Sequence, residues 1–88
     1  MARFRGVVRF FRPEQASGLA VIDVPHDVTA DLGGLKQMRV RGMLNGTEFS
    51  SNTMPAGGGV LALSVSRKLL DATGLKVGDS AEVEIERV

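Results

Sequence analysis

Two stretches of this chain resemble each other: GLAVIDVPHDVTADLG, residues 18–33, and GVLALSVSRKLLDATG, residues 59–74. Aligned with an offset of 41, they share three identical residues, at Gly18 and Gly59, Val24 and Val65, and Gly33 and Gly74. The apolar positions between these identities also coincide. Such self-similarity at a fixed offset is typical of an internal repeat. The chain therefore reads as two copies of one structural unit.

The alignment extends in both directions from these stretches. Backward, the same offset places Val8 on Phe49, and forward, after a slippage of two residues, Val40 falls on Val83. We therefore expect a single domain over residues 1–88, built of pseudo-repeat units at about 1–43 and 44–88.

Each unit has the pattern of two strands, a short helix and a third strand. Alternating apolar residues predict strands at about 3–10, 20–24 and 38–42 in the first unit, and at about 44–52, 61–65 and 81–86 in the second. Pro25 suits a helix start and Gly33 a helix end, while Ser66 and Gly74 hold the same places in the second unit. Closing six strands into a barrel removes exposed edges. The prediction is a mainly β fold, a small six-stranded barrel with two short helices and an internal pseudo-twofold.

The composition restricts the class of protein. The 88 residues include no cysteine and carry a net charge of +1, so we expect no disulfide framework, and a reducing cytoplasm as the compartment. The first ten residues, MARFRGVVRF, lack the apolar run of a signal peptide. No stretch approaches the roughly 20 apolar residues of a membrane span, and no motif indicates a cofactor.

The glycines of AGGGV, residues 56–60, raise the question of a phosphate-binding loop. A P-loop needs a lysine and a helix directly after its glycines. Here an alternating strand follows, and the next lysine is Lys68. A turn is therefore the better interpretation. If the barrel has a site at one end, its flexible loop is expected at Pro55, Gly57, Gly58 and Gly59.

Catalytic and metal-binding chemistry find little support. Asp23, His26, Asp27 and Asp31 fall at an exposed helix start, where acidic residues are favoured electrostatically, so no metal site is expected. His26 is the only candidate imidazole base for any serine nucleophile, and no G-x-S-x-G motif occurs. No pair of groups suggests general acid–base catalysis.

A basic stripe is the main candidate surface. Arg3, Arg5 and Arg9 share one face of the first strand, and Arg39 and Arg41 lie on the outer face of another. If these strands are neighbours, the five guanidinium groups form a patch for anions or nucleic acid. Alternatively, the arginines pair with acids on a neighbouring strand, for which the candidates are Glu82, Glu84 and Glu86. The sequence leaves both interpretations open.

A second candidate surface is apolar. Val7, Phe11 and Val21 are expected to point outward and to form a patch, and such patches often mark association. They would serve a homodimer contact or a protein partner.

Residues 40–88 also carry a family pattern: a V-x-G strand, an N-G turn, an aromatic residue, a glycine-rich turn, an apolar strand, a basic helix and a G-D turn. The matching residues are Val40 and Gly42, Asn45 and Gly46, Phe49, Pro55, Gly57 and Gly59, Leu61 to Val65, Arg67 to Leu70, and Gly78 and Asp79. The chain resembles a bacterial family of domains of unknown function that often precede a YdeI/OmpD-associated domain. The resemblance implies a double-split β-barrel, as in AbrB/MazE-type regulators, and no settled function.

Together these observations favour a non-enzymatic binding module for a protein or small-molecule partner. The alternatives are a DNA-binding regulator of AbrB/MazE type and a small enzyme or ligand-converting protein with a pocket at one barrel end.

Overall fold

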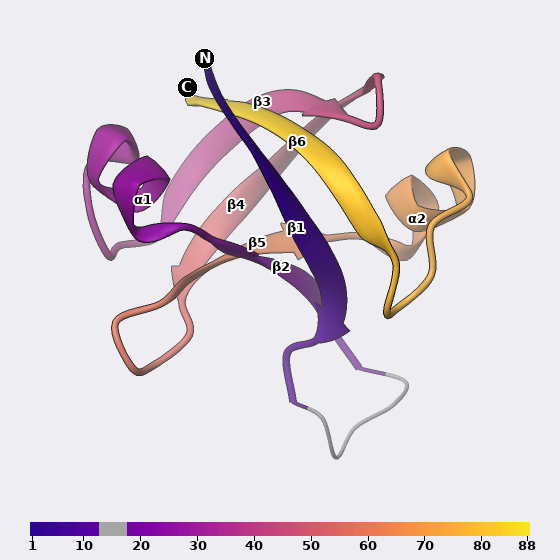
Figure 1. The fold of residues 1–88 in the computed structure, drawn as a ribbon, viewed down its shortest axis with the longest axis horizontal. Helices are drawn as coiled ribbons and strands as arrows, with labels where there is room; N and C mark the ends of the chain where they lie inside the picture. Colours follow the sequence, from indigo (N-terminus) through magenta and orange to yellow (C-terminus); the bar gives the residue numbers. More distant parts are fainter. Residues whose placement is uncertain (13–17) are drawn as a thin grey trace.

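The computed structural model describes residues 1–12 and 18–88. Its first half contains β1 (Ala2–Phe10), β2 (Ala20–Val24), α1 (His26–Leu32) and β3 (Met38–Leu44), and its second half contains β4 (Thr47–Pro55), β5 (Leu61–Val65), α2 (Arg67–Thr73) and β6 (Ser80–Arg87). The strands form a closed antiparallel barrel in the order β1-β2-β5-β4-β3-β6, with the two helices on opposite sides (Figure 1). The predicted mainly β fold is confirmed.

The barrel interior is filled by the alternate residues of every strand. The fully buried side chains that define this core include Val8, Ile22, Val40, Leu63 and Ile85. Burying an aliphatic side chain of this size contributes about 1.5–3 kcal/mol. Because alternation gives five of the six strands an apolar face, closing the sheet brings these faces together, while β4 contributes the half-buried Phe49 and the buried Thr53.

The helix ends follow the predicted signals. The Ser66 hydroxyl accepts a hydrogen bond of 3.1 Å from the backbone N–H of Leu69, and Gly74 ends α2 at a φ of 71°. Pro25 and Gly33 flank α1. The described part of the chain contains no helix with the length and apolarity that a membrane crossing requires.

The first strand of the second half differs from its prediction. It was expected at about 44–52, whereas Leu44 belongs to β3 and β4 runs over Thr47–Pro55. The two strands are joined by Asn45 and Gly46, whose φ angles are 47° and 84°. Positive φ at both positions is typical of a tight hairpin turn, and this turn sets where β4 begins.

The strand pairing also corrects the repeat alignment. Val8 pairs with Ile22, and Thr53 pairs with Leu63, the repeat equivalent of Ile22, so Thr53 and not Phe49 corresponds to Val8. The chain between the paired residues is four residues longer in the first half, which shifts the offset for β1 and β4.

The shifted register makes Phe4 the equivalent of Phe49. Phe4 pairs with Val83 and Phe49 pairs with Gly42, so Gly42 corresponds to Val83. The offset of 41 therefore continues through β3 and β6 without the predicted slippage of two residues.

Candidate functional site

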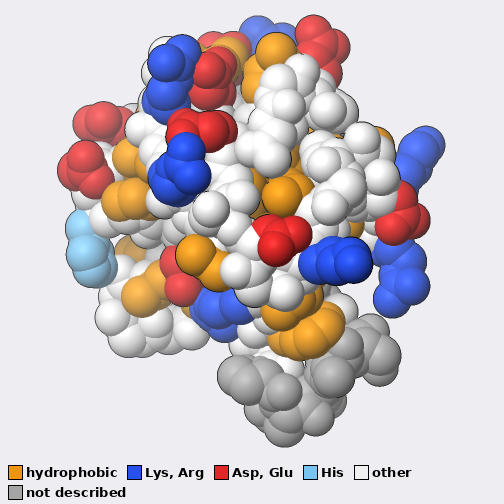
Figure 2. Space-filling view, turned by 45° about the vertical axis from the view of Figure 1, so that its right-hand side comes forward, with side chains coloured by type: hydrophobic (Ala, Val, Ile, Leu, Met, Phe, Trp, Pro, Cys, Tyr) orange, Lys and Arg blue, Asp and Glu red, His pale blue; other side chains and the backbone are white. Residues whose placement is uncertain are grey.

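The arginines of β1 and β3 do not lie on neighbouring strands. Strand β6 lies between β1 and β3 and carries acids toward both. The resulting ion pairs are Arg3 with Glu84 at 2.7 Å, Arg5 with Glu82, and Arg41 with Glu86 at 3.4 Å. Basic and acidic side chains are accordingly interspersed over the face in Figure 2. Ion pairs this exposed contribute about 0–1 kcal/mol each, but they leave this face with little excess positive charge.

Arg9 is bound differently from the other arginines. Its guanidinium donates three hydrogen bonds of 2.8–3.1 Å to the carboxylate of Asp23 on β2. These bonds raise the pKa of Arg9 above its already high ordinary value, although partial burial opposes the effect. Arg39 is exposed, and within residues 1–12 and 18–88 it has no ion pair. The five predicted residues are thus spread over two strands, and four of them have acidic partners.

The glycine-rich loop connects β4 to β5 as a tight turn. The backbone N–H of Ala56 donates to the carbonyl of Val60 over 2.8 Å. Gly57, Gly58 and Gly59 have φ angles of 86°, 63° and 77°. L side chains rarely adopt this conformation, so the turn uses all three glycines. Neither these glycines nor Pro55 line the pockets described below.

The predicted apolar patch is smaller than expected. Val21 is fully buried, so the prediction that it points into solvent is wrong. Phe11 is half-buried, and Val7 remains 54% exposed. The alternation of residues in β2 indicated that Val21 faces away from the barrel interior. It did not indicate that the outer side of β2 is shielded from solvent at Val21.

The acidic residues around His26 form no metal centre. Asp27 and Asp31 are exposed on α1, as is His26. Among the residues that the structure describes, no three His, Cys, Asp or Glu side chains gather closely enough to hold a metal ion.

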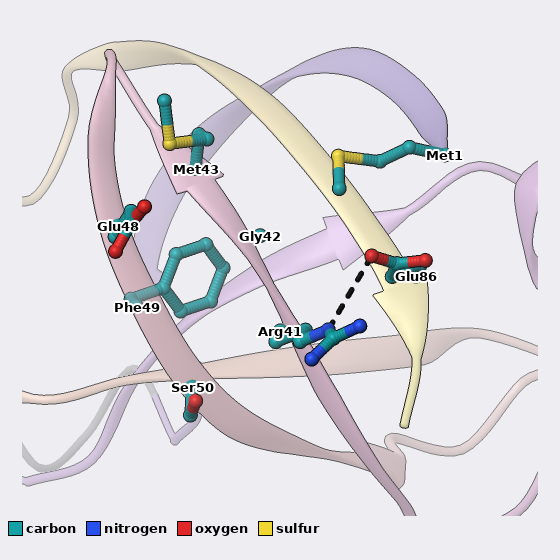
Figure 3. Close-up of a pocket in the computed structure, with 8 residues that line it drawn as sticks. All are labelled: Met1, Arg41, Gly42, Met43, Glu48, Phe49, Ser50 and Glu86. Carbon is teal, nitrogen blue, oxygen red and sulfur yellow. Dashed lines mark hydrogen bonds and ion pairs between the residues drawn. The ribbon is translucent and has the colours of Figure 1, made fainter.

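A pocket of about 520 Å³ lies over β3 and β4 and extends to β6 (Figure 3). We call it the β3–β4 pocket. It is lined by Met1, Arg41, Gly42, Met43, Glu48, Phe49, Ser50 and Glu86. Figure 3 shows the ring of Phe49 beside Gly42, with Glu48 on one wall and the ion pair of Arg41 and Glu86 on another. The volume falls within the usual range for small-molecule sites, roughly 300–1,000 Å³.

Gly42 lines this pocket and packs tightly against strand β6. A Cβ atom there would lie 1.7 Å from the carbonyl oxygen of Glu84 and 2.9 Å from the Cα of Ile85, both on β6. Only glycine therefore allows β3 to approach β6 this closely. Phe49, opposite Gly42 on β4, is half-buried and packs against the core.

The corresponding face of the first half is well packed. At the position of Phe49 it has Phe4, which is 8% exposed, and at the position of Gly42 it has Val83, which is fully buried. Its cross-strand neighbours are the ion pairs Arg3–Glu84 and Arg5–Glu82.

In the second half, the cross-strand pairs at the same two places are Glu48 with Met43 and Ser50 with Arg41. No base stands opposite Glu48, and no acid on β4 stands opposite Arg41, which bonds instead to Glu86 of β6. The β3–β4 pocket is thus the place where the two halves differ in both packing and charge.

A second hollow, the α2 groove, has a volume of about 260 Å³. It is lined mainly by apolar residues of β1, β2 and the region around α2, including Phe10, Leu19, Leu70 and Val77. It arises because α2 buries no residue completely, whereas α1 buries Val28, Thr29 and Leu32.

Sequence reasoning missed the residues of the β3–β4 pocket as a set. The sequence did contain a signal for this pocket: the cross-strand pair Arg3–Glu84 of the first half is replaced by Glu48–Met43 in the second. Using that signal requires the strand register, and the alignment of Phe49 with Val8 concealed the equivalence of Glu48 with Arg3.

The comparisons with known proteins identify the family. No curated protein matches the chain. A family model described as a domain of unknown function, DUF1905, matches residues 4–85. Because this match spans nearly the whole barrel, the protein belongs to the DUF1905 family.

Proposed function

We propose that this domain binds a small molecule in the β3–β4 pocket. The observation that carries the proposal is the difference between the halves: equivalent positions form a packed, charge-paired face in the first half and, in the second, a pocket in which Glu48 has no cross-strand base. Concave sites with an apolar surface and a few convergent polar groups are typical of ligand binding.

The lining residues support binding more than catalysis. Among the residues that the structure describes, Ser50 alone places a hydroxyl on the walls, and His26, the one histidine of the chain, is not among the lining residues. A nucleophile without a neighbouring base is weakly activated.

We also propose that the protein is bacterial and cytoplasmic, and that members of its family often precede a YdeI/OmpD-associated domain.

DNA binding of the AbrB/MazE type remains the competing hypothesis. It is less favoured because acids of β6 and β2 bind four of the five arginines, and phosphate affinity depends on available positive charge. Tight binding to random duplex DNA at low salt, lost at moderate salt, would favour DNA binding over our proposal.

The direct test is a screen of small neutral, anionic and cationic molecules by ¹H–¹⁵N NMR. We expect the amides of Gly42, Phe49 and Ser50 to shift together with at least one compound. The variant Phe49→Leu should weaken that binding. Phe10→Leu is the matched control, since Phe10 is also half-buried but lines the α2 groove. Shifts confined to the α2 groove, or none at all, would overturn the proposal.

A further inference from the structure

The walls of the β3–β4 pocket carry more acid than base. Glu48 and Glu86 are opposed by one basic side chain, Arg41, whose Nε atom already lies 3.4 Å from Glu86. Within the described part of the chain, no ion pair or side-chain hydrogen bond engages Glu48. The side chains that line the pocket therefore carry a net negative charge, and Glu48 is the acid among them that has no paired base.

The first half shows how such a carboxylate is matched elsewhere in this barrel. There, Glu84 lies opposite Arg3, and their side chains pair at 2.7 Å. In the pocket the acid is on β4, at the position of Arg3, and the residue opposite is Met43 instead of a charged one. The three glutamates of β6, Glu82, Glu84 and Glu86, each pair with an arginine on a neighbouring strand, whereas Glu48 has no such partner among the described residues.

Glu48 shares the pocket with several apolar side chains. Phe49 is its chain neighbour, and the ring faces into the pocket beside Gly42 in Figure 3. Met43 and Met1 add two thioether side chains to the walls. An aromatic face attracts cations, and methionine packs adaptably against apolar groups of varied shape.

We propose that the ligand of this pocket is an organic cation, with an ammonium group against Glu48 and an apolar body against Phe49 and Met43. This inference rests on the proposed function, since it names the ligand class of the same pocket. The ligand ammonium takes the place of the base that the first half supplies through Arg3. Arg41 keeps Glu86 paired, so Glu48 is the carboxylate that discriminates by charge.

Three probes of similar shape test the ligand class: 2-phenylethylamine, which is cationic at pH 7, 2-phenylethanol, which is neutral, and 3-phenylpropanoate, which is anionic. Each is titrated into the full chain and followed through the amides of Gly42, Phe49 and Ser50. We expect the amine to bind at least about three-fold more tightly than the alcohol and the carboxylate to bind most weakly. The preference for the amine should shrink as salt is raised.

The variant Glu48→Gln should remove the preference for the amine over the alcohol. Glu82→Gln is the matched control, because Glu82 is an exposed acid that pairs with Arg5 and does not line the pocket. Equal or tighter binding of the alcohol or carboxylate, or an unchanged preference in Glu48→Gln, would overturn the cation inference while leaving the pocket a binding site. If no molecule of any charge shifts these amides, both proposals fail.

Discussion

Replacing Gly42 with alanine tests whether glycine is required for the close approach of β3 to β6. The added Cβ would stand 1.7 Å from the carbonyl oxygen of Glu84, 2.7 Å from its carbonyl carbon and 2.9 Å from the Cα of Ile85. All three are backbone atoms, so no side chain can rotate away to relieve the overlap. The two strands have to separate, along a ladder that joins five residue pairs.

The expected cost of Gly42→Ala is about 3 kcal/mol or more in the free energy of unfolding, as for severe overpacking. Alanine is otherwise favoured over glycine within a strand by roughly 0.5–1 kcal/mol, so the sign of the effect depends on the clash alone. For a domain of this size, 3 kcal/mol lowers Tm by about 12–24 °C. Thermal and urea unfolding followed by circular dichroism measure both quantities.

Gly58→Ala is the matched control for this substitution. Its Cβ would meet no atom within 4 Å, but its φ is +63°, so the cost is backbone strain of about 1–2 kcal/mol. The reasoning is refuted if Gly42→Ala destabilises the protein no more than Gly58→Ala does, because the steric contact with β6 would then be unimportant.

Three further substitutions test other parts of the fold. Thr53→Val should lower the free energy of unfolding by about 1–3 kcal/mol. The buried Thr53 hydroxyl accepts a hydrogen bond from the backbone N–H of Met38 and donates one to the backbone carbonyl of Lys36, each of 3.1 Å. Urea unfolding measures the change, and an unchanged stability would contradict this expectation. Ser66→Ala removes the cap of α2 and should cost about 1 kcal/mol, seen as faster amide exchange in α2 but not in α1. A double-mutant cycle on Arg3 and Glu84 should give a coupling below about 1 kcal/mol; a larger value would show that this exposed pair is a main source of stability.

The elements of the fold could be predicted from the sequence because their signals are local. Alternating apolar residues located the strands, and Ser66 and Gly74 marked the ends of α2. The register of β1 and β4 could not be predicted from a constant offset, because the β1–β2 connection is four residues longer than the β4–β5 connection.

The candidate site depended on relations that the sequence does not display. Three arginines of β1 and β3 form ion pairs with acids of β6, and not one basic patch, because β6 lies between these two strands. This strand order is set by the closing of the barrel. The glycines 57–59 were expected to provide only a pliant turn, whereas their positive φ angles show a defined conformation. Phe49 was noted as part of a family pattern, but its role on the pocket wall required its pairing with Gly42.

We attribute ligand binding in the β3–β4 pocket to the loss of the matched charges that the first half retains. The most direct measurement restores that match, by combining Glu48→Arg with Met43→Glu to reproduce the pairing of Arg3 with Glu84. We expect this variant to keep a Tm close to that of the parent chain and to show no shifts at Gly42, Phe49 and Ser50 when 2-phenylethylamine is added. Ligand shifts at those amides as large as in the parent chain would contradict this expectation.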